Sequence, residues 1–114
     1  MNNNVSTEKE PLPEVCIIGL GYVGLTLAVA MANAGYRVHG VEKAAFIREC
    51  IEGGRAHFSE IGLDEHLARH VQEGRLTVSE TVRPTDASVY IITVGTPLTG
   101  NGVVNLASLE DVMT

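Results

Sequence analysis

The feature that most constrains this 114-residue chain is a glycine-rich hexapeptide placed between two apolar segments. Gly19, Gly21 and Gly24 form a G-x-G-x-x-G pattern directly after the apolar run 15–18. A longer stretch of small and apolar residues, 22–34, follows it. The first run has the length of a buried strand, and the second is rich in alanine and predicts a buried helix. The chain is therefore expected to make a tight strand-to-helix turn at these glycines.

The three glycines have different roles in such a turn. Gly19 permits the sharp bend, Gly21 lets a pyrophosphate approach the backbone, and Gly24 lets the helix lie close to the strand. The first turn of the helix then offers free N–H groups and the positive end of the helix dipole to the phosphates. The hexapeptide in this context predicts a dinucleotide-binding site.

An acidic residue follows at the distance that this interpretation requires. Glu42 ends the next predicted strand, 18 residues after Gly24. A carboxylate there can accept hydrogen bonds from both ribose hydroxyls, and it repels a 2′-phosphate. NAD is therefore expected rather than NADP, although the neighbouring Lys43 is a cation that tolerates a phosphate. The alternative is that Glu42 is an ordinary exposed carboxylate at the end of a strand.

The rest of the chain alternates between strand and helix patterns. Strands are predicted at about 15–19, 37–42, 76–79 and 88–94, and helices at 22–34 and 44–52, with a third that begins near Leu63 and is closed by Gly74. Such alternation predicts an α/β fold with a parallel sheet and right-handed crossovers. The expected arrangement is a partial Rossmann-type sheet with strand order 3-2-1-4, leaving one sheet edge uncovered.

Two of these helices carry more specific expectations. On the helix 44–52, Phe46, Ile47, Cys50 and Ile51 share one face at helical periodicity, which predicts a buried stripe. Asn105 is a plausible N-cap for a last helix over 106–114.

Composition and charge exclude several classes of function. Asp and Glu number 14 against 8 Lys and Arg, and no basic cluster occurs, so nucleic acid is not an expected partner. The polar segment 1–13 lacks the apolar stretch of a signal peptide and is predicted to be a disordered leader before a single domain, 14–114. No stretch has the length of a membrane span, so a cytoplasmic location is expected.

The cysteines and histidines do not predict a metal site or a disulfide framework. Cys16 and Cys50 are the only cysteines, and Cys16 lies in an apolar run typical of a core position. His66 and His70 have helical i, i+4 spacing but lack the acidic partner of an HExxH motif. No metal ligand is therefore proposed.

The segments taken together resemble the UDP-glucose/GDP-mannose dehydrogenase family. The resemblance runs from about residue 14 to the last residue, and its segments occur in the family's order and at close to its spacing. They are IIGLGYVGL at 17–25, the acidic strand end, HFSEIGLDEHL at 57–67, GRLTVSET at 74–81 and VYIITVGTP at 89–97. The VGTP sequence after the fourth strand is the most discriminating of them.

The resemblance implies an NAD-dependent enzyme that oxidises the C6 alcohol of a nucleotide sugar to a carboxylate, as in polysaccharide biosynthesis. It assigns the pyrophosphate loop to Gly19, Gly21, Tyr22, Val23 and Gly24. It assigns the ribose to Glu42, which is more often Asp in the family. It places beside the adenosine half of the cofactor the strand-end loop Val94, Gly95, Thr96 and Pro97. It also implies a nucleotide-sugar substrate, with UDP-N-acetylhexosamine or UDP-glucose expected, and a homo-oligomer.

The sequence departs from the family pattern at three places. Ile61 stands where the family has the proline of Glu-Pro-Gly-Leu. The family's basic residue one turn beyond the ribose acid falls near Ile47, with Arg48 one residue further along. The segment 80–87 is short and contains Pro84.

The family's nucleophilic cysteine, catalytic lysine and sugar-binding domain lie further along the chain than residue 114. No catalytic residue is therefore assigned here, and we expect residues 1–114 alone to be inactive as part of a longer enzyme. The alternatives are a stand-alone dinucleotide-binding or redox-sensing module without catalysis, and a fragment that folds poorly.

Overall fold

The computed structural model describes residues 12–82 and 87–93 of the chain. Within these ranges the elements, in chain order, are β1 (Glu14–Ile18), α1 (Tyr22–Asn33), β2 (Arg37–Val41), α2 (Ala45–Glu52), α3 (Leu63–Gln72), β3 (Leu76–Ser79) and β4 (Ala87–Ile92). The predicted loop 94–97 and the predicted helix after Asn105 lie outside the described residues.

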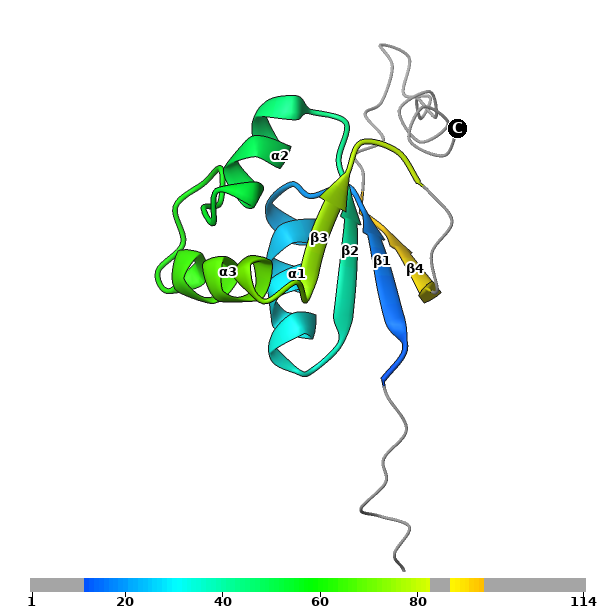
Figure 1. Ribbon diagram of the computed structural model, residues 1–114. Helices are drawn as coiled ribbons and strands as arrows, with labels where there is room; N and C mark the ends of the chain where they lie inside the picture. Colours follow the sequence, from blue (N-terminus) through cyan, green and yellow to red (C-terminus); the bar gives the residue numbers. More distant parts are fainter. Residues whose placement is uncertain (1–11, 83–86, 94–114) are drawn as a thin grey trace, which may run out of the picture.

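The described strands form one parallel sheet in the order β3-β2-β1-β4. This confirms the predicted α/β class, strand order and parallel pairing, with strand ends that differ from the predicted ones by a residue or two. Helices α1, α2 and α3 all lie on the same side of the sheet (Figure 1). Because the strands are parallel, their carboxyl ends meet at one end of the molecule, where the loops after β1 and β2 lie.

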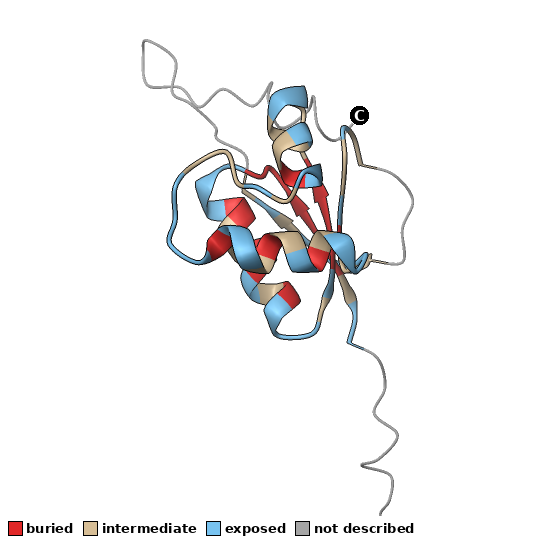
Figure 2. Ribbon diagram, turned by 60° about the vertical axis from the view of Figure 1, so that its left-hand side comes forward, coloured by how far each residue is buried: buried red, intermediate tan, exposed pale blue. Residues whose placement is uncertain are grey.

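The core lies mainly between this sheet and its helices. Buried residues concentrate there (Figure 2). Side chains alternate along each strand, so Val15 and Ile17 of β1 face the helices, whereas Cys16 and Ile18 belong to a smaller cluster on the opposite face. Cys16 is buried as predicted, and burial, followed by the charge of Glu14, raises the pKa of its thiol.

The helices end where the sequence predicts. Gly35 follows the C-cap of α1 with a φ of 107°, and Gly74 follows the C-cap of α3 with a φ of 77°. Both angles lie in the left-handed region, where a residue with a Cβ is strained, so glycine terminates each helix. None of the helices in the ranges 12–82 and 87–93 is long and apolar enough to cross a membrane.

The predicted buried stripe of α2 is wrong in part. Ile51 is fully buried and Ile47 packs against the core, but Cys50 is only half-buried and Phe46 is 68 % exposed. The reason is the position of the helix: α2 begins beyond the carboxyl end of β2 (Figure 1), and it is Ile51, near its last residue, that lies near Val71 of α3 and Leu76 of β3. Periodicity predicts which residues of a helix share an apolar face, but it does not predict how much of that face the rest of the core covers.

The last described strand carries exposed apolar side chains at the edge of the sheet. Val89, Tyr90 and Ile92 of β4 are each exposed, whereas Ile91 packs against the core on the helical side.

Candidate dinucleotide-binding site

The glycine-rich turn is joined to the neighbouring strand as well as to its own. Gly19 follows β1 with a φ of 95°, a left-handed conformation that permits the sharp bend. Its N–H donates to the carbonyl oxygen of Val41 at 2.8 Å. The first residue of the turn after β1 is therefore hydrogen-bonded to the end of β2, next to Glu42.

The contact between α1 and this turn requires a glycine. A Cβ on Gly24 would collide with the carbonyl oxygen of Gly19 and would lie 2.5 Å from Oγ1 of Thr93. At Gly21, in contrast, a Cβ would meet nothing within 4 Å. Gly24 is thus needed for packing within the protein, whereas Gly21 faces open space, as a backbone approached by a ligand should.

The first turn of α1 suits an anion. Gly21 is the N-cap, with a φ of −70°, and no side chain of the described residues caps the helix. No acidic residue occupies the first turn, and Tyr22 and Val23 are both more than half exposed. The N–H groups of the first turn have no acceptor within the helix itself, so they are available to a phosphate.

Glu42 is tied to the glycine-rich turn by a direct hydrogen bond. Its Oε1 accepts from the N–H of Leu20 at 2.8 Å, and its Oε2 accepts from the N–H of Ala44 at 3.0 Å. A carboxylate offers about four acceptor positions, so each oxygen retains one for a further donor. The acid and the glycine-rich turn are thus directly joined, and the carboxylate retains acceptor positions for further donors.

Arg48 binds the backbone of the turn between β2 and α2, which carries Glu42. Its Nη1 donates to the carbonyl oxygens of Glu42 at 2.8 Å and of Lys43 at 2.9 Å. The sequence departs from the family pattern at this basic residue, and the structure shows that the guanidinium binds the backbone that carries the acid.

A second loop, between α2 and α3, reaches the first turn of α1. The Oη of Tyr22 donates to Oε1 of Glu60 at 3.2 Å, and the ring of Tyr22 lies against that of Phe58 with centroids 5.0 Å apart. The charge of Glu60 and this hydrogen bond raise the pKa of the Tyr22 hydroxyl, so it stays protonated at neutral pH. Ile61, at the position of the family's proline, is fully exposed.

Thr93 and Gly40 are part of this arrangement, although the sequence analysis did not single them out. Oγ1 of Thr93, directly after β4, donates to the carbonyl oxygen of Gly19 at 2.6 Å, and its N–H donates to that of Ile18 at 2.8 Å. The buried side chain of Leu20 occupies the space left by Gly40 of β2, where a Cβ would lie 2.5 Å from it. The sequence signals that could have indicated them are a hydroxyl residue at the end of an apolar strand, for Thr93, and a glycine inside a strand, for Gly40.

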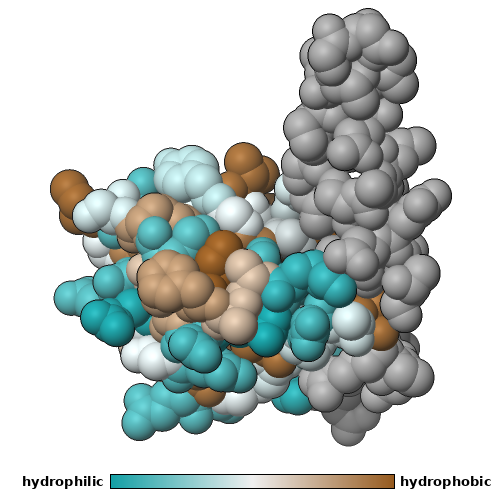
Figure 3. Space-filling model, turned by 90° about the horizontal axis from the view of Figure 1, so that it is seen from above, coloured by the Kyte–Doolittle hydropathy of each residue, from teal (hydrophilic) through white to brown (hydrophobic). Residues whose placement is uncertain are grey.

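The structure therefore brings together Gly19, Gly21, Tyr22, Val23, Gly24 and Glu42. The other predicted site residues, Val94, Gly95, Thr96 and Pro97, lie outside the described residues. Figure 3 looks down on the end where the strands terminate and shows hydrophilic side chains around an apolar patch near the middle of the described surface.

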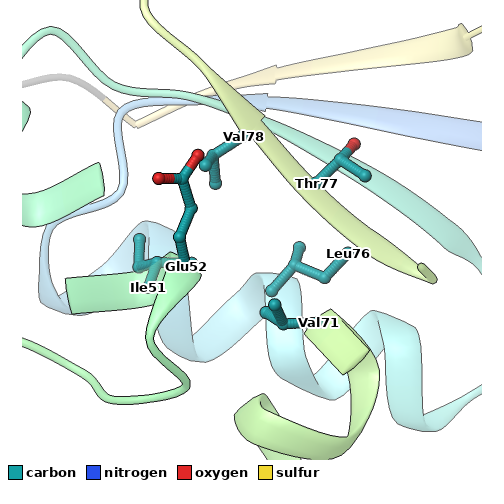
Figure 4. A pocket seen from close by; sticks show the side chains of 6 residues that line it. All are labelled: Ile51, Glu52, Val71, Leu76, Thr77 and Val78. Carbon is teal, nitrogen blue, oxygen red and sulfur yellow. The ribbon is translucent and has the colours of Figure 1, made fainter. Parts of the chain in front are cut away.

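A hollow of about 320 Å³ lies elsewhere, between α2, α3 and β3. It is lined by Ile51, Glu52, Val71, Leu76, Thr77 and Val78 (Figure 4). It lies at the β3 edge, two strands away from the turn after β1, and its lining is mainly apolar. It is not part of the site described above.

His70, one of the two histidines with helical spacing, joins two helices. Nε2 of His70 lies 2.7 Å from Oδ1 of Asn33, which joins α3 to α1. His70 is buried, and burial, followed by the charges of Arg69 and Arg75, lowers the pKa of its imidazole. Over 12–82 and 87–93, no group of three His, Cys, Asp or Glu side chains is placed to hold a metal ion.

The parallel sheet, the glycine-rich turn and the acid at the end of β2 together define the nucleotide-binding half of a Rossmann-type domain. The sequence model of the UDP-glucose/GDP-mannose dehydrogenase family, NAD binding domain, matches residues 13–114. The chain therefore belongs to this family and contains its NAD-binding domain.

Individual relatives act on different sugars according to their names. The chain is 37 % identical over 101 residues to a UDP-N-acetyl-D-mannosamine dehydrogenase of Methanococcus aeolicus, covering 89 % of this chain and 22 % of that protein. It is 38 % identical over 102 residues to a GDP-mannose 6-dehydrogenase of Azotobacter vinelandii, covering 86 % and 23 %. A solved UDP-glucose dehydrogenase of Pyrobaculum islandicum superimposes with a TM-score of 0.75 at 34 % identity, covering 89 % and 24 %. The chain thus spans less than a quarter of these relatives.

Proposed function

We propose that the turn between β1 and α1 holds the pyrophosphate of NAD and that Glu42 binds the adenosine ribose. The turn contributes Gly19, Gly21, Tyr22, Val23 and Gly24. On the resemblance alone, the adenosine side is completed by Val94, Gly95, Thr96 and Pro97. The observation that carries the proposal is the 2.8 Å hydrogen bond from Leu20 to Glu42, because it unites the phosphate loop and the ribose acid.

The site has the chemistry that this cofactor needs. Backbone N–H groups of the first turn of α1 face an anion, and a carboxylate with two unused acceptor positions faces the ribose hydroxyls. The same carboxylate repels a 2′-phosphate, so NAD is preferred to NADP. NAD supplies the hydride acceptor, while the described residues bind and orient it.

For the whole protein, we propose oxidation of the C6 alcohol of a nucleotide sugar to a carboxylate. The support is membership of the family and relatives whose names give a UDP-sugar or a GDP-sugar as substrate. A UDP-N-acetylhexosamine is the first candidate, because relatives named UDP-N-acetyl-D-mannosamine dehydrogenase match at 36–39 % identity. GDP-mannose is an equal candidate, since a relative named GDP-mannose 6-dehydrogenase matches at 38 % identity.

Cofactor binding is tested by titrating the chain with NAD and with NADP by calorimetry, for the wild type and for Glu42→Gln. We expect NAD to bind the wild type more tightly, and Glu42→Gln to lose about tenfold or more for NAD, since a hydrogen bond to a charged group contributes about 1.5–3 kcal/mol. Equal affinity of the wild type for NADP and NAD would remove Glu42 from the site.

The activity is tested on the gene product that carries this chain. It is incubated with NAD and, separately, with UDP-N-acetylmannosamine, UDP-glucose and GDP-mannose, and NADH absorbance is followed. Two NADH formed per sugar consumed supports the dehydrogenase. NAD binding without oxidation of any sugar supports the stand-alone binding module instead.

A further inference from the structure

Arg48 lies one turn into α2, below the turn that connects β2 to this helix. Both of its hydrogen bonds among the described residues start from Nη1 and end on consecutive backbone carbonyls, those of Glu42 and Lys43. Arg48 as a whole is half-buried. A single donor nitrogen that binds two successive carbonyls fixes the orientation of both peptide planes.

The side chain of Glu42 is held by the same stretch of backbone. Its Oε2 accepts from the N–H of Ala44, 3.0 Å away, while its Oε1 reaches across to the N–H of Leu20. In the turn between β2 and α2, Arg48 therefore binds the carbonyl oxygens of Glu42 and Lys43, and the side chain of Glu42 binds the N–H of Ala44. The contact at Oε2 lasts only while the peptide between Lys43 and Ala44 keeps its orientation, and Arg48 binds the carbonyl of that same peptide.

We propose that Arg48 is a positioning residue for the ribose-binding carboxylate, and that it acts without touching the cofactor. The inference rests on the proposed role of Glu42. By fixing the turn, Arg48 directs the two unused acceptor positions of Glu42 outward, toward the 2′- and 3′-hydroxyls of an adenosine ribose. Arg48 therefore determines how strongly the protein recognises the 2′-hydroxyl.

The ordinary alternative is that Arg48 only stabilises the start of α2. The two roles differ in what they require of Glu42. If Arg48 is a positioning residue, it has no effect on binding once the carboxylate of Glu42 is gone. Removing Arg48 alone then lowers the discrimination between a ribose and a 2′-deoxyribose. A merely stabilising residue changes the melting temperature but leaves that discrimination intact.

The experiment measures the affinity of the 114-residue chain for NAD and for its analogue with 2′-deoxyadenosine. The variants are Arg48→Met, which keeps the aliphatic stem, Arg48→Lys, Glu42→Gln and the double variant Arg48→Met/Glu42→Gln. Arg37→Met serves as the matched control, because Arg37 is an exposed arginine at the opposite end of β2.

We expect the wild type to prefer NAD over the 2′-deoxy analogue by about tenfold, the size of one hydrogen bond to a charged group. Arg48→Met should bind NAD about tenfold more weakly and should lose most of the preference. The NAD affinity of Arg48→Lys should lie between those of the wild type and Arg48→Met. The double variant should bind NAD no more weakly than Glu42→Gln does. Arg37→Met should match the wild type.

A second measurement does not depend on the cofactor. Amide hydrogen exchange in the free chain should be faster at Leu20 and Ala44 in Arg48→Met, and unchanged at Val41 in the adjoining strand. If Arg48→Met does not fold, Arg48→Lys takes its place in both measurements.

The outcomes separate the two proposals. If the wild type binds neither NAD nor its analogue, the proposed cofactor site is wrong and the role of Arg48 falls with it. If the wild type binds NAD and Arg48→Met retains both affinity and preference, or leaves the exchange of Leu20 and Ala44 unaltered, the role of Arg48 alone is overturned.

Discussion

Both ends of α1 are held by contacts from distant parts of the chain. The two ends differ in whether these contacts leave backbone groups of the helix without a partner. At the C-terminal end, Asn33 accepts a hydrogen bond from His70, and Nη1 of Arg75 donates to the carbonyl oxygen of Gly35 at 3.0 Å. At the N-terminal end, the turn is supported by Glu42 and Thr93, yet no side chain of the described residues caps the helix.

This difference locates stability and function on one helix. Each helix end leaves backbone groups without intrahelical partners, and these groups need partners from elsewhere. At the C-terminal end the protein supplies them itself, because the N–H groups of Ala34, Gly35 and Tyr36 donate to carbonyl oxygens of the last turn. At the N-terminal end the protein fixes the surrounding backbone but leaves the N–H groups of the first turn for a ligand. The predictions below test this division between packing and binding.

The largest effect is expected at Gly24, where α1 touches the turn. Gly24→Ala places a Cβ against the carbonyl oxygen of Gly19, a backbone atom that cannot move without breaking the turn. The free energy of unfolding should fall by about 3 kcal/mol, the upper part of the range for overpacked sites. Chemical denaturation monitored by circular dichroism measures it. A change below about 0.5 kcal/mol, the range of ordinary surface substitutions, would show that the helix does not depend on this close approach.

Gly21→Ala is the matched substitution on the ligand side of the same turn. Nothing lies within 4 Å of the added Cβ, and the φ of −70° suits an alanine, so the melting temperature should stay close to that of the wild type. NAD affinity should fall by about tenfold or more, because the methyl group occupies space that the pyrophosphate needs. Unchanged affinity measured by calorimetry would place the pyrophosphate elsewhere.

Thr93→Val tests the support of the turn by β4. The substitution keeps the shape of the side chain and removes the hydroxyl that donates to Gly19. Stability should fall by about 1 kcal/mol, the usual contribution of one hydrogen bond, and NAD affinity should fall less than in Gly21→Ala. The denaturation midpoint measures the first, and Thr93→Ser, which keeps the hydroxyl, should restore most of the loss.

The smallest effect is expected at the closed end of α1 and depends on pH. Burial first, and then Arg69 and Arg75, lower the pKa of His70 below its usual value, so the folded state favours the neutral ring. Its contribution to stability is therefore complete above about pH 6.5 and is lost as the pH falls through the lower folded pKa. His70→Gln keeps a donor toward Asn33 without a titrating ring.

Melting temperatures measured between neutral and mildly acid pH should accordingly fall less steeply for His70→Gln than for the wild type. Identical slopes for His70→Gln and the wild type would mean that His70 titrates alike in the folded and unfolded chain.

Much of the fold follows from short stretches of sequence. The apolar run before Gly19, the alanine-rich stretch after Gly24 and the glycines at positions 35 and 74 predict the strand, the helix and the helix ends that the structure shows. The acid at residue 42 was predicted to end β2, and it lies directly after that strand. These features depend on residues that are neighbours in the chain, so local periodicity and backbone sterics suffice.

The contacts that complete the site depend on residues far apart in the chain. Glu42 meets the N–H of Leu20 across 22 residues, and Thr93 meets Gly19 across 74. A local pattern does not contain such pairings, because they exist only when the strand order 3-2-1-4 brings the carboxyl ends of the strands together. Phe46 shows the same limit, since its helical face was predicted but not the distance to which the core extends beneath it.

The sequence by itself determined that this chain makes a strand, a glycine-rich turn, a helix and a second strand with an acid directly after it. The tertiary structure alone decided that both oxygens of this acid are anchored by backbone amides, that Arg48 holds the turn that carries it, and that Thr93 supports Gly19. The physical reason is that glycine sterics and hydrophobic periodicity act over one or two turns, whereas hydrogen bonds between loops require the sheet to be assembled first.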